Sequence, residues 1–273
     1  MSIAMRRTWL ACLALCSGRQ LRHDQQHTMV PESFSHDSHK QQREVLVLAF
    51  GDSLTAGLHS CAPGAPLESC SFSPYAPHLQ DELRKRGHTT ALVKQKGYSG
   101  WTSQELLVKP SGTFEQPELS QLLQREGRTT LAVLMAGSND LGRRKTASAE
   151  DIAHDVWSLH DVAHGQHVPT VLVAIPPTGL GMGVRDHHEY EQARQKVNAR
   201  LRERCSAAGA FCTFAECPVD WIGREDTRWE PDAVHMSASG YEALGRGIAP
   251  TVSEALTDAL SRAAELQAVK EEL

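Results

Sequence analysis

The hydrophobic residues beyond position 43 fall into short unbroken runs that alternate with longer, spaced patterns. Val45–Phe50, Leu131–Met135 and Val171–Ile175 are continuous apolar runs of strand length. Such runs are typical of strands that are buried on both faces of a parallel sheet. Shorter runs at Thr89–Val93 and Ala210–Phe214 predict two further strands, so we expect a sheet of about five.

Longer segments between and after these runs have the character of helices. They are Pro74–Arg86, Ser148–His164, Asp186–Ala208 and Ser237–Ala268, the last with a break near Pro250. Gly87 is a typical helix stop, and Ser148 is a typical N-cap. Strands that alternate with helices pair in parallel through right-handed crossovers. The pattern therefore predicts a three-layer α/β/α sandwich around a central, mostly parallel sheet.

The first 42 residues differ in composition from the rest. Two arginines precede the apolar run Trp9–Cys16, and small residues follow, which resembles a secretory signal peptide over residues 1–18. The alternative is a disordered extension or a wrongly chosen start codon. The pattern therefore leaves two locations open, secreted and cytoplasmic. Residues 19–42 are rich in His, Gln and Ser and predict a disordered polar linker. We expect the folded domain at 43–265 and a C-terminal tail at 266–273.

Composition narrows the function by exclusion. The net charge is -5, the pI is near 6.3 and only 5% of the residues are aromatic, which argues against a nucleic-acid-binding surface. No apolar run reaches the roughly 20 residues of a membrane-spanning helix. His160 and His164 have a spacing that can bind zinc, but no third ligand is evident nearby. We interpret them as a solvated helix face and expect no metal.

Seven cysteines are present. Cys61 and Cys70 flank a loop rich in Pro and Gly and are candidates to close it with a disulfide if the protein is secreted. Cys205, Cys212 and Cys217 include no Cys-x-x-Cys pair, so we do not expect a zinc site there.

Reactive side chains follow the predicted strands at the edge where parallel sheets bind ligands. Ser53 lies just past the first strand, Asn139 follows the third, and Asp232 and His235 lie near the C-terminus. Alone, each has a plain structural interpretation as a helix cap, a turn or a polar loop. Together they supply the nucleophile, oxyanion donor, orienting acid and base that acyl transfer requires.

These blocks, in this order, resemble the SGNH family, a branch of the GDSL-type lipases and esterases. The sequence contains FGDSLTAG around Ser53, GSND around Asn139 and DAVH at Asp232–His235, and YSGWTS after the second strand fits the family's second block. The resemblance extends from about Glu44 to about Ser261. It implies a flavodoxin-like SGNH hydrolase fold and no cofactor.

The resemblance also implies a role for each matching residue. Ser53 would attack an ester carbonyl, and His235 would take its proton and return one to the leaving alcohol. Asp232 would orient His235. The backbone amides of Ser53 and Gly100 and the side chain of Asn139 would form the oxyanion hole.

Residues near these blocks are secondary candidates. Gly97 is a weaker candidate for the oxyanion-hole glycine. Trp101, beside Gly100, is a candidate substrate-binding residue, as are Trp221 and Trp229 more distantly, although each is equally suited to the core.

Three further features are interpreted from their position. Asp52 and Asp140 lie next to predicted site residues, and we expect their side chains to form structural hydrogen bonds. The loop His59–Ser73 either walls the substrate pocket or is a plain surface loop. The loop Gly179–Gly183 is hypothesised to move when substrate binds.

The leading hypothesis is a serine esterase that acts on a small-molecule ester with a small acyl or acetyl group. A lysophospholipase, a thioesterase or an acyltransferase would use the same residues. A catalytically silent binding protein with this fold is the alternative from another class. A flavodoxin-like nucleotide binder ranks last, because no phosphate-binding loop follows the first strand. The oligomeric state is left open.

Overall fold

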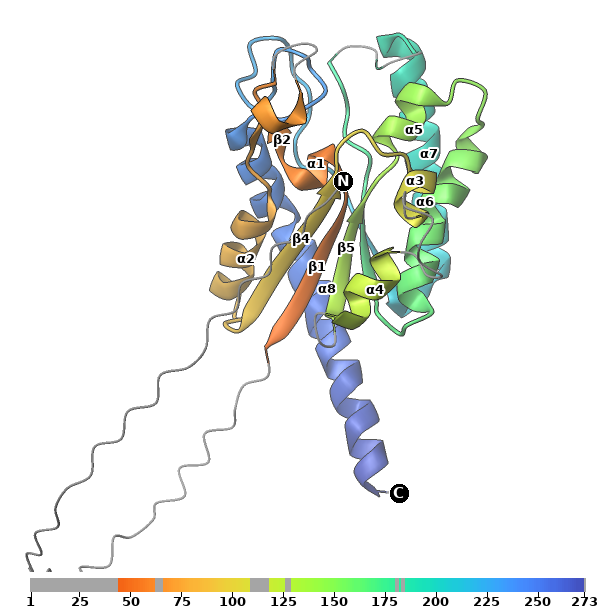
Figure 1. Ribbon diagram of the computed structural model, residues 1–273. Coiled ribbons are helices and arrows are strands. Elements are labelled where there is room, and N and C mark those ends of the chain that lie inside the picture. The colour runs from red at the N-terminus through yellow and green to blue at the C-terminus, as the bar shows by residue number, and fades with distance from the viewer. Residues whose placement is uncertain are drawn as a thin grey trace, which may run out of the picture. The chain divides into compact units, whose positions relative to one another are not determined.

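The computed structural model describes residues 44–61, 66–108, 118–125, 129–179, 182 and 185–272 (Figure 1). The expected signal peptide at 1–18 and the linker at 19–42 lie outside the described residues, and so does most of the loop Gly179–Gly183.

Five parallel strands form the central sheet, in the order β4-β1-β5-β6-β7. Their bounds are Val45–Asp52 for β1, Ala91–Tyr98 for β4, Thr129–Met135 for β5, Thr170–Val173 for β6 and Cys212–Ala215 for β7. Helices cover both faces of this sheet (Figure 1). The predicted three-layer α/β/α fold is therefore confirmed.

Two groups of helices make the outer layers. α2 (Ala76–Lys85) and α8 (Ala238–Glu272) pack together on one face. The other face is covered by α3 (Ser103–Leu107), α4 (Glu118–Arg125), α6 (Ala149–His164) and α7 (His187–Ala207). Two short helices, α1 (Ser53–Ala56) and α5 (Ser138–Arg143), follow β1 and β5 directly. A small hairpin of β2 (Leu58–His59) and β3 (Ser71–Phe72) follows α1.

The alternation of side chains along a strand explains the unbroken apolar run of β1. Val47 and Ala49 face the core shared with α2 and α8, whereas Leu48 and Phe50 face the core under α4 and α6. All four side chains are buried. Both faces of the strand are covered, so no position in the run favours a polar residue.

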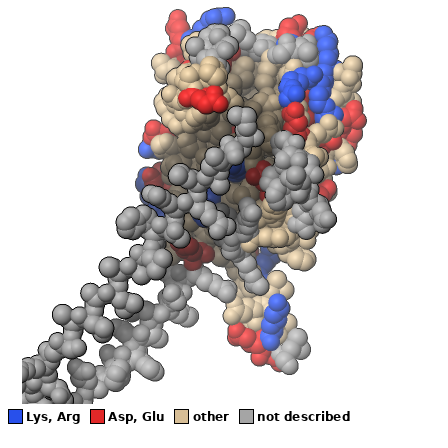
Figure 2. All heavy atoms as spheres, viewed as in Figure 1, with Lys and Arg blue, Asp and Glu red and all other residues tan. Residues whose placement is uncertain are grey.

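Acidic and basic side chains are interspersed on the outer surface that Figure 2 shows.

β4 is longer than predicted. It extends past the predicted end at Val93 to Tyr98, although Lys94, Gln95 and Lys96 are exposed. Among the described strands β4 lies at the edge of the sheet and pairs with β1 alone, and charged residues are common on edge strands. Apolar periodicity alone therefore missed the second half of the strand.

The predicted break in the last helix is wrong. α8 continues through Pro250 and ends at Glu272, beyond the predicted end at Ala268. A proline removes one helical hydrogen bond and crowds the preceding turn. Ile248 and Val252, on either side of Pro250, are fully buried in the core and hold the helix in place across that position.

Candidate active site

Ser53 lies at the turn where the chain leaves β1 and enters α1. Asp52 is the N-cap of α1 and accepts a hydrogen bond of 2.9 Å from the backbone N–H of Leu54. Gly51 has to be glycine, because a Cβ atom there would lie 2.0 Å from the carbonyl oxygen of Met135 on β5. Closely packed backbone therefore holds Ser53, which is 6% exposed.

The structure brings Ser53, His235 and Asp232 into one chain of hydrogen bonds. The hydroxyl oxygen of Ser53 lies 3.0 Å from Nε2 of His235, and Nδ1 of His235 lies 2.7 Å from Oδ2 of Asp232. The other carboxylate oxygen, Oδ1, accepts 2.9 Å hydrogen bonds from the backbone N–H groups of Val234 and His235.

The charge of Asp232 decides the tautomer of His235. Burial raises the pKa of Asp232, but hydrogen bonds from the His235 side chain and from two backbone N–H groups outweigh it, so the pKa lies below its usual value. A carboxylate beside Nδ1 favours the tautomer with the proton on Nδ1. Nε2 then carries a lone pair directed at the hydroxyl of Ser53.

The segment that carries Asp232 and His235 bends back on itself. Ala233 has φ 55°, in the left-handed region that residues other than glycine rarely occupy. The backbone N–H of Ala233 donates to the Glu230 carbonyl at 2.9 Å, and the N–H of Glu230 donates to the His235 carbonyl at 2.9 Å. This strained turn lets two side chains that are three residues apart meet.

Gly100 and Asn139 follow β4 and β5, the two neighbours of β1 in the sheet. The backbone N–H of Trp101 donates to the Tyr98 carbonyl at 3.2 Å and closes a turn in which Gly100 has φ 82°. A positive φ at the third residue is the mark of a type II turn. The side-chain amide of Asn139 donates to the Trp101 carbonyl at 2.9 Å, which uses one of its two hydrogens.

The secondary candidates have packing roles. A Cβ atom on Gly97 would lie 2.2 Å from the backbone of α1, so this glycine lets α1 lie against β4. The ring of Trp101 stacks on Tyr98 at 4.2 Å and packs against the core, and its predicted substrate contact stays a prediction. Trp221 and Trp229 meet edge to face in the core on the α8 side.

Two aspartates beside the site residues form structural contacts. Asp52 is buried, which raises its pKa to about 7, and its second carboxylate oxygen has no hydrogen-bond partner among the described residues. Asp140 accepts hydrogen bonds from the backbone N–H of Ser103 at 2.8 Å and from its hydroxyl at 2.7 Å. His235 bonds to Asp232 rather than to either of them.

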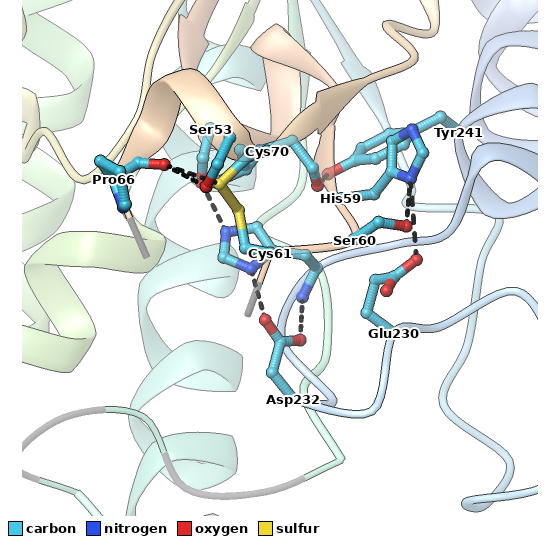
Figure 3. The surroundings of a disulfide bond; sticks show 12 residues. Ser53, His59, Ser60, Cys61, Pro66, Cys70, Glu230, Asp232 and Tyr241 are labelled. Atoms are coloured by element: carbon cyan, nitrogen blue, oxygen red, sulfur yellow. Dashed lines mark hydrogen bonds and ion pairs between the residues drawn. A yellow bond between two sulfur atoms is a disulfide. The ribbon is translucent and has the colours of Figure 1, made fainter. Parts of the chain in front are cut away.

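The β2–β3 hairpin borders the site through a disulfide. Cys61 and Cys70 are bonded, and Ser53 lies in the surroundings of this bond (Figure 3). The hairpin also meets the loop of His235, because Nδ1 of His59 lies 3.9 Å from a carboxylate oxygen of Glu230. Sequence reasoning proposed this disulfide as one option and missed the contact with Glu230, which has no local signature.

A second disulfide, between Cys205 of α7 and Cys212 of β7, was not predicted. Cys217 is a free thiol. In the part of the chain that the structure describes, no group of three His, Cys, Asp or Glu residues is placed to hold a metal ion. No helix within the same residues is long and apolar enough to cross a membrane.

The interpretation of His160 as part of a solvated helix face is wrong. His160 is completely buried, and its Nδ1 lies 2.8 Å from the hydroxyl of Thr170. His164 is partly buried and contacts the same hydroxyl through Nε2 at 3.0 Å. Burial lowers the pKa of His160 to about 3, so the ring is neutral. Thr170 on β6 supplies the polar partner that makes burial possible, and the helix sequence does not reveal it.

These features define an α/β enzyme fold with a serine, a histidine and an aspartate aligned at the carboxyl edge of its sheet. The model of the GDSL-like Lipase/Acylhydrolase family matches residues 49–243, which include every site residue described above. The chain therefore belongs to this family, and it is a hydrolase that acts on esters.

Solved structures share the fold. Est24, a carbohydrate acetylesterase from Sinorhizobium meliloti, is 20% identical with a TM-score of 0.58, over 77% of this chain and 99% of that one. An inhibitor-bound aryl esterase of M. smegmatis is 20% identical with a TM-score of 0.59, again over 77% and 99%. A GDSL-like lipase from Bacteroides thetaiotaomicron is 19% identical with a TM-score of 0.51, over 81% and 90%. No curated protein matches the sequence significantly.

Proposed function

We propose that this chain is a serine esterase that cleaves small acyl esters through a Ser53–His235–Asp232 triad and an acyl-enzyme intermediate. The observation that carries the proposal is the unbroken line of hydrogen bonds, 3.0 Å from Ser53 to His235 and 2.7 Å from His235 to Asp232. Both distances are within hydrogen-bond reach, as required for proton transfer from Ser53 to His235 and for orientation of His235 by Asp232.

In the proposed reaction, the Ser53 oxygen attacks the ester carbonyl while Nε2 of His235 takes the hydroxyl proton. Asp232 stabilises the imidazolium that forms. The carbonyl oxygen becomes an oxyanion, which the backbone N–H groups of Ser53 and Gly100 and the second N–H of Asn139 would bind. His235 then returns the proton to the leaving alcohol, and water hydrolyses the acyl-enzyme by the same steps in reverse.

The substrate class is also part of the proposal. Structural neighbours include an aryl esterase and a carbohydrate acetylesterase, which supports a small acyl group on an alcohol. The two disulfides support an oxidising compartment, such as the one a secreted protein reaches. We propose that residues 43–265 form the hydrolase domain.

A comparison of Ser53→Ala with wild type tests this proposal. The full-length chain is assayed with p-nitrophenyl esters of increasing acyl length, and Ser158→Ala is the control because Ser158 is a partly exposed serine of α6 that bonds within its own helix. We expect turnover in wild type and in the control, highest with the shortest acyl groups, and none in Ser53→Ala. Equal turnover in Ser53→Ala would disprove the proposed nucleophile.

The same series separates the variants of the reaction. Preference for long acyl chains would replace the small-ester proposal with a lysophospholipase. Product esters formed from an added alcohol would indicate acyl transfer in place of hydrolysis. A folded wild type without any turnover would favour a binding protein.

A further inference from the structure

Arg143 is a residue of α5 that the proposed mechanism does not use, and it contacts the turn that carries Gly100. Its Nη1 donates a 2.8 Å hydrogen bond to the carbonyl oxygen of Gly100. The same guanidinium forms a fork with Glu105, from Nη1 to Oε2 at 2.8 Å and from Nη2 to Oε1 at 3.2 Å. A bidentate pair has a defined geometry, so Glu105 directs Arg143 at the Gly100 carbonyl.

Glu105 is itself fixed by the first turn of α3. It accepts hydrogen bonds from the backbone N–H of Thr102 at 2.7 Å and from the Thr102 hydroxyl at 3.0 Å, as part of a capping box. The backbone N–H of Thr102 contributes most to holding the pKa of Glu105 below its usual value, and Arg143 contributes as well. Glu105 is therefore a charged and anchored partner for Arg143.

Asn139 and Arg143 act on consecutive carbonyl groups. They are four residues apart in α5 and so lie on the same face of that helix. Asn139 binds the Trp101 carbonyl at 2.9 Å, and Arg143 binds the Gly100 carbonyl at 2.8 Å. Side chains of α5 thus hold the two peptide groups that follow the Gly100 nitrogen.

Gly100 depends on such external bonds because its own packing restrains it little. Apart from its two chain neighbours, no described residue has a heavy atom within 4 Å of the place where a Cβ atom would be, and φ is 82°. Glycine opposes rotation about its own backbone bonds least. The direction of the Gly100 N–H therefore depends on how firmly the adjoining peptides are held, and Arg143 holds the one that follows Gly100.

We propose that Arg143 is a positioning residue for the oxyanion hole. By holding the Gly100 carbonyl, it keeps the turn in the form that presents the Gly100 N–H to the oxyanion. The inference rests on the proposed esterase function. Arg143 acts through Gly100 and does not touch the substrate.

Kinetics of Arg143→Ala and Arg143→Lys in the full-length chain test the proposal. Lys145→Ala is the matched control, because Lys145 is a nearby cation, similarly exposed, that pairs with Glu189 instead. We expect Arg143→Ala to lower kcat about 10- to 100-fold with little change in KM, since a small misplacement of a catalytic group has effects of this size. Arg143→Lys keeps the charge but not the fork, so its kcat stays low. Added guanidinium ion restores part of the activity of Arg143→Ala.

Unchanged kcat in Arg143→Ala would overturn the proposal, and so would wild-type kcat in Arg143→Lys, which would mean that charge alone suffices. Backbone hydrogen exchange of residues 98–102 gives a readout that does not need turnover. It should be faster in Arg143→Ala and Arg143→Lys than in Lys145→Ala, and equal exchange would also overturn the proposal. Lack of ester turnover in wild type would contradict the esterase function instead, and the exchange rates would still decide the role of Arg143.

Discussion

The turn that carries Ser53 and the loop that carries His235 differ in what holds them in place. Around Ser53, backbone packs directly on backbone, and Gly51 leaves no space for even one carbon atom. Around His235 the side chains are more open, with 22% of the His235 side chain and 49% of the Asp232 side chain exposed, and hydrogen bonds fix the turn. The position of Ser53 is thus fixed by the core, whereas the position of His235 depends on local polar contacts. Substitutions in the first region should affect stability, and those in the second should affect activity alone.

The largest expected effect is on activity and comes from Asp232→Asn. An amide in place of the carboxylate favours the wrong tautomer of His235, so kcat should fall about 10³- to 10⁴-fold. The melting temperature should stay near that of wild type, because Asp232 is half-exposed. Ester kinetics and thermal unfolding of the same sample check this. A large loss of stability would show that the His235 loop contributes to the stability of the fold as the Ser53 turn does.

Gly51→Ala should show the opposite pattern. The new methyl group would lie 2.0 Å from the Met135 carbonyl, so β1 and β5 would have to move apart. We expect a loss of about 3 kcal/mol or more in the free energy of unfolding, measured with denaturant. Gly165→Ala, at an α6 C-cap with φ -61°, should lose less than about 1 kcal/mol. Similar losses in both variants would mean that the Ser53 turn is not packed as described.

The two disulfides of the described residues differ in position, because Cys61–Cys70 borders the site and Cys205–Cys212 does not. Replacing either pair by serines should cost about 2 to 3 kcal/mol of stability, the loop entropy of a short crosslink. Only Cys61→Ser/Cys70→Ser should also raise KM, by about 3- to 10-fold. Cys205→Ser/Cys212→Ser is the control, since it joins α7 to β7. Equal KM values in the two double variants would show that the hairpin does not contribute to substrate binding.

The smallest expected effects are two opposite pH dependences of stability. The pKa of buried His160 is lowered to about 3, so between pH 6.5 and 3 the unfolded chain binds a proton that the folded chain does not, and acidification destabilises the fold. The pKa of Asp52 is raised from 3.8 to about 7, so the folded chain keeps a proton that the unfolded chain releases, and acidification below about pH 7 stabilises it.

Variants of these two residues separate the contributions. Between pH 7 and 5.5, His160→Phe should gain stability relative to wild type and Asp52→Asn should lose it, each by about 1 to 2 kcal/mol. Denaturant unfolding at the two pH values measures both. Parallel changes in the two variants would show that one of these groups does not have the protonation state assigned to it.

The sequence predicted what depends on local patterns. Strands such as β1 and β5 were evident because both of their faces are buried. Ser53 and Asn139 were singled out because each follows a strand end, whereas Asp232 and His235 were singled out by their match to a family block. The second half of β4 was not predicted, because it contains Lys94 and Lys96 and an edge strand does not require an apolar run. The rule that a proline ends a helix considers only the local sequence. It therefore missed that core packing holds α8 together across Pro250.

Contacts between segments that belong to no family motif could not be predicted. The buried His160 has a partner for its Nδ1 only because Thr170 lies on a neighbouring strand. Arg143 follows the motif of Asn139, but its meaning appears only when Gly100 and Glu105 are seen beside it. In each case the deciding partner lies on another element of the fold, and no spacing rule connects the two.

Identification of the residue that reacts with a fluorophosphonate probe is the direct test of Ser53 as the nucleophile. The full-length protein is labelled, digested and analysed by mass spectrometry, in wild type, His235→Ala and Ser158→Ala. We expect one adduct, on Ser53, in wild type and in Ser158→Ala, and a strong loss of labelling in His235→Ala because no base removes the hydroxyl proton. An adduct on another residue, or undiminished labelling of Ser53 without His235, would contradict this expectation.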